Sequence, residues 1–92
     1  MKTNLKPYII QMVINGVDYN FHGCEKLSGR PYFFNGYASL DTNCYFRTYK
    51  HCKNAIREGK KIHSYFQKRG LLKDKQIRVV NMIDDSVVMV LA

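Results

Sequence analysis

The dipeptide Asn15-Gly16 is the strongest constraint on the fold of this chain, because it separates two runs in which apolar residues alternate. A two-residue hairpin turn needs a positive φ at both positions, and asparagine followed by glycine meets that need well. With this turn, the residues that pair on one face are all apolar: Ile10, Met12, Ile14, Val17, Tyr19 and Phe21. The opposite face is mixed, with Val13 opposite Asp18. The sequence therefore predicts a β-hairpin of strands 8–15 and 17–24 with one face in the core.

Turn residues divide the rest of the chain into short elements. Ser28-Gly29 predicts a loop, and Asn35-Gly36 predicts a second hairpin. The strands predicted after the first hairpin are 32–34, 37–40, 44–47 (either a strand or the lead into a helix), 76–83 and 87–91.

A long helix is predicted over residues 49–69. Thr48 is a suitable N-cap because its hydroxyl can accept a hydrogen bond from an unpaired backbone N–H of the first turn. At the other end, Gly70 followed by Leu71 fits a Schellman motif. At 100° per residue, one arc of roughly 120° is suited to face a sheet: Cys52, Ala55, Ile56, Gly59, Ile62, His63 and Phe66. We therefore expect an α+β domain of order β-β-β-β-α-β-β, a small antiparallel sheet built from hairpins with one amphipathic helix on one face.

The length and the apolar pattern limit the class of protein. The chain has 92 residues, which fits a single domain over 1–92. Its apolar runs are of strand length, so neither a membrane span nor a signal peptide is expected. Its three cysteines are an odd number without a CxxC pair, which favours reduced thiols. These features predict a soluble cytoplasmic protein.

Positive charge is concentrated in one part of the sequence. The formal net charge is +8, yet residues 47–78 contain eleven Lys or Arg and two acidic residues, a local charge of +9. The other sixty residues contain four bases and five acids, a charge of −1. A surplus that served solubility alone would be spread more evenly.

The basic residues of the predicted helix fall on an arc of about 100° opposite its apolar arc. They are Lys50, Lys53, Arg57, Lys60, Lys61 and Lys68, with Arg47, Arg69 and Lys73 at the edges. An ordinary solvated helix face is the alternative, but such faces usually mix charges of both signs. The stripe therefore predicts contact with nucleic acid or another acidic surface. No sequence-reading motif accompanies it, so recognition by shape or charge is expected.

The aromatic residues around the second hairpin have two interpretations. Tyr32, Phe33, Phe34 and Tyr37 can belong to the core or to a contact with another protein, or they can stack on bases. Strand alternation places Phe33 on the face opposite Tyr32 and Phe34. A hydrophobic strand surface with Phe33, Tyr37 and Val13, together with Ile9 and strand 87–91, is the predicted protein interface and would also allow a homodimer through a strand edge.

Catalysis, metal binding and cofactors are not expected. Cys52 follows His51, but neighbours on a helix point about 100° apart, so they do not form a nucleophile–base pair. No phosphate-binding glycine loop is present, and His22, Cys24, Cys44, His51 and Cys52 lack the spacing of a zinc site.

The stretch Phe46-Arg-Thr-Tyr, followed by Ala55-Ile56 and the β segment 77–80, resembles a pattern in small phage and mobile-element proteins. The likeness covers about half of the chain. That class includes anti-CRISPR and anti-restriction proteins, which implies an inhibitor acting in the host cytoplasm on a host defence protein that processes nucleic acid. The positive charge excludes DNA mimicry. The leading hypothesis is a non-enzymatic basic module that binds nucleic acid or a nucleoprotein, and the alternative is the docked inhibitor.

Overall fold

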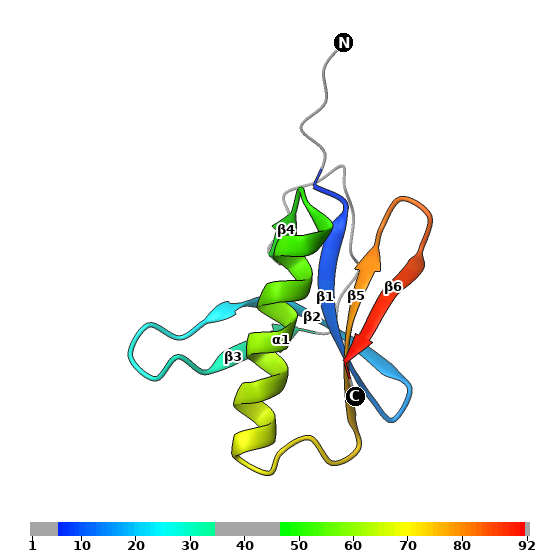
Figure 1. Cartoon of the computed structure of the whole chain (residues 1–92). Helices are drawn as coiled ribbons and strands as arrows, with labels where there is room; N and C mark the ends of the chain where they lie inside the picture. The colour runs from blue at the N-terminus through cyan, green and yellow to red at the C-terminus, as the bar shows by residue number, and fades with distance from the viewer. Residues whose placement is uncertain (1–5, 35–46, 92) are drawn as a thin grey trace.

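The described part of the protein forms an antiparallel sheet of six strands with one helix packed on one face (Figure 1). The computed structural model describes residues 6–34 and 47–91. Its elements are β1 (Tyr8–Ile14), β2 (Val17–Cys24), β3 (Pro31–Phe34), β4 (Thr48–Tyr49), α1 (Cys52–Lys68), β5 (Lys75–Asn81) and β6 (Ser86–Leu91). The predicted α+β class and the order β-β-β-β-α-β-β are confirmed.

Strand β1 is the centre of the sheet. The strand order is β3-β2-β1-β5-β6, and β5 pairs with β1 along its whole length. The pairing of β2 with β1 runs from Gln11 to Ile14, whereas β4 pairs with β1 at Tyr8 and Ile9. The backbone N–H of Arg47 donates to the carbonyl of Phe21 over 2.8 Å. Strand β4 therefore occupies the place beside the start of β1 where β2 has diverged.

The first hairpin has the predicted turn, and its predicted register is confirmed from Ile14 back to Gln11, whereas the expected pairing of Ile10 with Phe21 does not form because β2 diverges from β1 there. Asn15 and Gly16 have φ values of 52° and 80°, as a two-residue turn of this type requires. Ile14 pairs with Val17, and Met12 pairs with Tyr19. Local turn chemistry and the apolar alternation agree here, which is why the prediction succeeded.

The start of the helix differs from the prediction, whereas its end is confirmed. Thr48 is not the N-cap, because Thr48 and Tyr49 form β4 and the helix begins at Cys52 after His51, whose side chain makes no cap hydrogen bond. Pairing with β1 holds these β-favouring residues in a strand. At the other end, Gly70 has a φ of 67°, and the N–H of Leu71 donates to the carbonyl of Phe66 over 2.9 Å, as in a Schellman motif.

The core lies between α1 and the facing side of the sheet. It consists of Ile10, Met12, Phe21, Ala55, Ile62, Phe66, Ile77 and Val79. Helix α1 presents two small residues, Ala55 and Gly59, to this interface and both are buried. A Cβ atom on Gly59 would lie 3.0 Å from Cδ1 of Leu91 on β6. The glycine, which costs helix propensity, thus allows a close approach of α1 to β5 and β6.

The sheet face away from the helix is less exposed than expected, and Phe33 does not belong to it. Ile9 and its cross-strand partner Val80 are buried there, although Ile9 was expected on an exposed surface. Phe33 lies half-buried against the core, with its ring centroid 5.4 Å from that of Phe21 and 6.3 Å from that of Phe66. Pairing with Phe21 turns Phe33 toward the helix, in agreement with the core interpretation, and its role at a protein interface stays a prediction.

Several predictions concern residues outside the described ranges. They are the Asn35-Gly36 hairpin, strand 37–40 with Tyr37, the segment 44–46 with Cys44, and Phe46 of the phage-like pattern.

The close approach at Gly59 generates a prediction about stability. We expect Gly59→Val to lower the free energy of unfolding by about 1–3 kcal/mol, because the added methyl groups overpack the contact with Leu91 and Val79. Thermal unfolding followed by circular dichroism measures this change. The matched control, Gln67→Val on the exposed side of α1, should change stability by at most about 0.5 kcal/mol. Equal losses in both variants would show that the packing at Gly59 does not matter.

Candidate nucleic-acid interface

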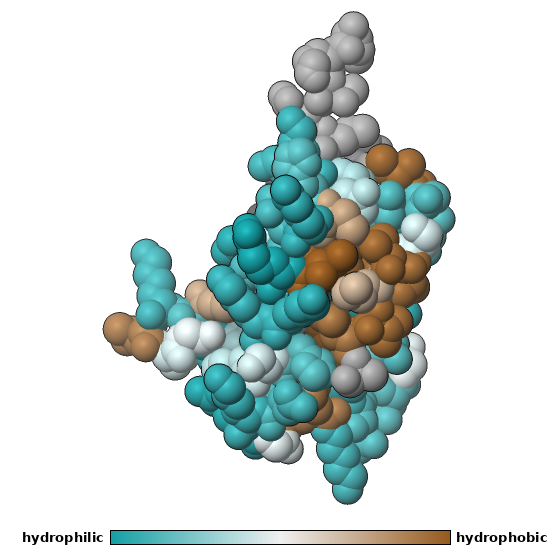
Figure 2. Space-filling view, viewed as in Figure 1, coloured by the Kyte–Doolittle hydropathy of each residue, from teal (hydrophilic) through white to brown (hydrophobic). Residues whose placement is uncertain are grey.

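Five basic side chains project from the side of α1 that faces away from the sheet. They are Lys53, Arg57, Lys60, Lys61 and Lys68, called the basic stripe from here on, and all five are exposed. The buried positions of the same helix, Ala55, Gly59, Ile62 and Phe66, lie on the opposite side. Figure 2 shows the resulting hydrophilic surface along the helix. The contact with the sheet therefore fixes the direction of the stripe.

The other three predicted binding residues are exposed but lie outside the regular stripe. Lys50 is in the bend between β4 and α1, because the helix begins later than predicted. Arg47 precedes β4 and lies over Gly23 on β2: its Nη2 atom is 3.5 Å from the position that a Cβ atom on Gly23 would take. Arg69 is the C-cap, where its guanidinium stacks 3.7 Å from the ring centroid of Tyr65 and donates to the Tyr65 carbonyl over 3.2 Å.

The stripe lacks acidic partners within the described part of the chain. Among residues 6–34 and 47–91, the one ion pair joins Arg78 and Asp18 at 3.3 Å. Arg57 donates to Oδ1 of Asn54 over 3.0 Å, which leaves its charge uncompensated. The helix also has no acidic residue in its first turn. The positive charge of the stripe is thus available to an external anion.

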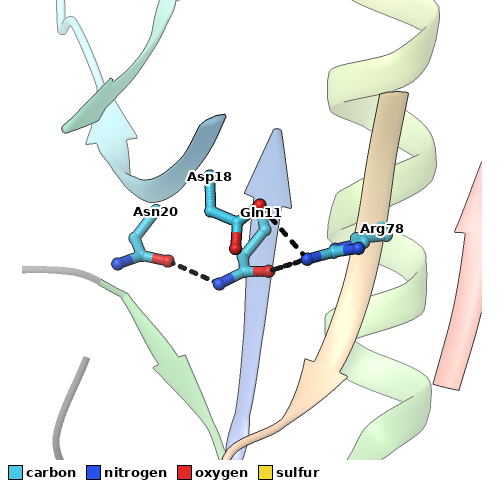
Figure 3. A network of polar contacts seen from close by, with 4 residues as sticks. All are labelled: Gln11, Asp18, Asn20 and Arg78. Carbon is cyan, nitrogen blue, oxygen red and sulfur yellow. Dashed lines mark hydrogen bonds and ion pairs between the residues drawn. The ribbon is translucent and has the colours of Figure 1, made fainter. Parts of the chain in front are cut away.

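Arg78 differs from the residues of the basic stripe, because its positive charge is paired within the sheet. It lies on β5 and donates to Oε1 of Gln11 on β1 from Nε at 3.1 Å and from Nη2 at 3.0 Å. Nη2 also contacts Asp18 on β2, and Gln11 donates to Oδ1 of Asn20 over 3.0 Å (Figure 3). This polar ladder crosses three strands on the face away from α1. Arg78 belongs to the basic segment of the sequence, but its guanidinium is already bound by Gln11 and Asp18 within the protein.

A shallow open hollow of about 760 Å³ lies along the stripe. Its lining combines cations with apolar side chains: Lys53, Ile56, Arg57, Lys60, Lys61, Ser64, Tyr65, Lys68 and Arg69. An open surface of this kind suits an extended anion better than an enclosed small molecule.

A cluster beside the stripe is unsuited to nucleophilic chemistry. Partial burial and the carboxylate of Glu58 raise the pKa of the Cys24 thiol, and Arg47 opposes them only in part. The same residues act on Tyr49, whose pKa is also raised, chiefly by burial. Its hydroxyl is buried and has no hydrogen-bond partner in the described structure. A reactive cysteine needs a lowered pKa, so this thiol is a poor nucleophile.

Exposed aromatic rings lie on the sheet face away from the stripe. The ring of His22 lies 5.3 Å from that of Tyr32 and 4.8 Å from that of Phe34, between centroids. Contact of His22 with these aromatic rings was not predicted from the sequence. The signal was present, because His22 lies two residues after Asn20 and therefore on the same predicted outer face of the strand. The structure does not bring the aromatic cluster and the basic stripe together.

Two further searches concern the described ranges alone. Within them, no group of three or more His, Cys, Asp or Glu is arranged to hold a metal ion. No helix in these ranges has both the length and the apolar character needed to cross a membrane.

The position of Glu58 predicts the reactivity of Cys24. Because the carboxylate raises the thiol pKa, less thiolate is present near neutral pH, and Glu58→Gln should speed alkylation of Cys24 by iodoacetamide. Peptide mass spectrometry after timed labelling measures the rate at this site. Asp74→Asn, which removes a carboxylate elsewhere, is the control and should leave the rate unchanged. An unchanged rate in Glu58→Gln would refute the electrostatic coupling.

Comparisons with known proteins assign this chain to no family. It matches no protein-family model, and neither the curated proteins nor the solved structures contain a match. The resemblance to small phage and mobile-element proteins therefore stays a prediction.

Proposed function

We propose that this protein binds nucleic acid through the basic stripe, without catalysis, by contacts to the phosphate backbone. One observation carries the proposal: five exposed cations lie on one side of α1, and none has an acidic partner among the described residues. Duplex DNA carries one negative charge per about 1.7 Å of its axis, which makes a nucleic-acid backbone a good electrostatic complement to a row of cations.

Self-repulsion within the helix supports a role in binding. Lys53 and Arg57 are four residues apart, as are Arg57 and Lys61, and each such pair of like charges costs about 0.2–0.5 kcal/mol on a helix. The positive end of the helix dipole adds to the potential near Lys53. A solvated face with no partner would be more stable with acids at some of these positions. A bound polyanion removes the repulsion.

The dimensions and chemistry of the stripe suit contacts that do not read sequence. The 17 residues of α1 extend over about 25 Å, long enough to lie along several successive phosphates. Four of the five stripe residues are lysines, which act as point charges without bidentate geometry. Such contacts position a protein on nucleic acid and supply salt-sensitive affinity by counterion release.

Reversal of charge on the stripe tests the proposal. We expect the triple variant Lys53→Glu, Arg57→Glu, Lys60→Glu to lose binding to labelled duplex DNA, single-stranded DNA and RNA while its thermal stability does not fall. In the unmodified protein, log Kd should rise with log salt concentration at a slope of about 3–5, as expected for several displaced counterions. Fluorescence anisotropy across a salt series measures both.

The matched control reverses three exposed bases elsewhere. Lys6→Glu, Lys26→Glu, Arg30→Glu makes the same change of net charge away from α1, so binding should weaken far less. Equal weakening in the two triple variants would mean that net charge acts without a defined site. Failure of the unmodified protein to bind any of the three nucleic acids near physiological salt would refute the proposal. The host-protein inhibitor would then become the leading hypothesis.

A further inference from the structure

The outer edge of β6 lacks the features that keep sheet edges from pairing. Among the described residues, β6 is the last strand of the sheet and pairs only with β5. Its six residues, Ser86–Leu91, include no charge, proline or glycine. Alternate backbone N–H and C=O groups of an edge strand point outward, and uncharged edges are templates for another strand.

The apolar side chains of β6 add to this edge. Val87, Val88 and Val90 are 45%, 40% and 46% exposed, and Ile83 in the preceding turn is 59% exposed. Figure 2 shows an apolar patch beside the hydrophilic surface of α1. The strand at the other end of the described order, β3, is short and begins with Pro31 directly after the exposed Arg30. The β3 edge is thus better protected against pairing with another strand than the β6 edge.

We propose that β6 pairs in antiparallel fashion with β6 of a second copy of this chain. An uncharged strand opposite its own copy brings no like charges together, whereas most of the positive charge lies on the outer side of α1. A strand also satisfies the outward backbone groups, which an apolar ligand would not. The pairing of β6 with β5 shifts register between Val79 and Val80, which leaves Val88 without a partner on β5. The seam is therefore centred on the regularly paired part of β6, from Met89 to Leu91.

The geometry of such a pair relates the two basic stripes. Antiparallel strands at the seam of a continuous sheet are related by a two-fold axis perpendicular to the sheet, so both α1 helices lie on one side of it. The two stripes then face the same way. This consequence rests on the proposed function, and it predicts that nucleic acid long enough to contact both helices binds two copies together.

Salt separates the two proposals. Nucleic-acid binding weakens as salt rises, but dimerisation of two positively charged copies strengthens because their repulsion is screened. Sedimentation analysis without nucleic acid, at about 0.5 M salt and over a concentration range of about two decades, is therefore expected to show a monomer–dimer equilibrium. A dimer without nucleic-acid binding would overturn only the proposed function, and binding by a strict monomer would overturn only the β6 pairing.

A charge on the edge tests the seam. Val88→Lys should weaken dimerisation at least tenfold, since it places a charge beside the seam in each copy and a charged edge strand opposes pairing. Val17→Lys is the matched control, because Val17 is a similarly exposed strand valine at 39% and lies away from β6. The control should dimerise like the unmodified chain. Equal weakening in both variants would overturn the assignment of the seam.

Hydrogen exchange on the unmodified chain gives a second readout that does not depend on folding of a variant. Raising the protein concentration should protect amides of β6 and leave those of β3 unchanged. Protection confined to another element, or polydisperse association without a defined dimer, would overturn the proposal.

Discussion

The close contact of α1 with the sheet is the interaction on which the rest of the structure depends. Ala55 and Gly59 are the small buried residues of the helix, and at Gly59 the side chain of Leu91 on β6 fills the space that a larger helix residue would take. Larger apolar side chains, Ile62 and Phe66, complete the interface. Because this contact sets the rotation of the helix about its axis, it also directs the basic stripe away from the protein.

The fold treats positive charge in two different ways. Arg78 is held by Gln11 and Asp18 in a ladder of hydrogen bonds across three strands, where its charge serves the sheet. The stripe cations have no comparable partners in the described ranges, and they repel one another along the helix. A group that is satisfied inside the protein has little free energy to gain from a ligand, whereas a repelling row of cations gains from any anion that neutralises it.

The proposed β6 seam and the basic stripe use opposite kinds of surface. Apolar burial and backbone hydrogen bonds would hold the seam, and both tolerate salt. Counterion release would hold nucleic acid at the stripe, and salt opposes it. With β6 at the end of the strand order and α1 directed outward, the two surfaces do not compete for the same residues. One small domain can therefore use both at once.

Local chemistry in the sequence by itself determined the Asn15-Gly16 hairpin, its register next to the turn, the Gly70 helix end, the α+β order and the exposure of the stripe bases. Each depends on backbone preferences or on periodicity within one element. Long-range packing decided the rest: β4 takes Thr48 away from the helix, and pairing with Phe21 turns Phe33 inward. Local sequence does not predict these contacts, because the free energy that stabilises them comes from pairing between strands that only the folded chain brings together.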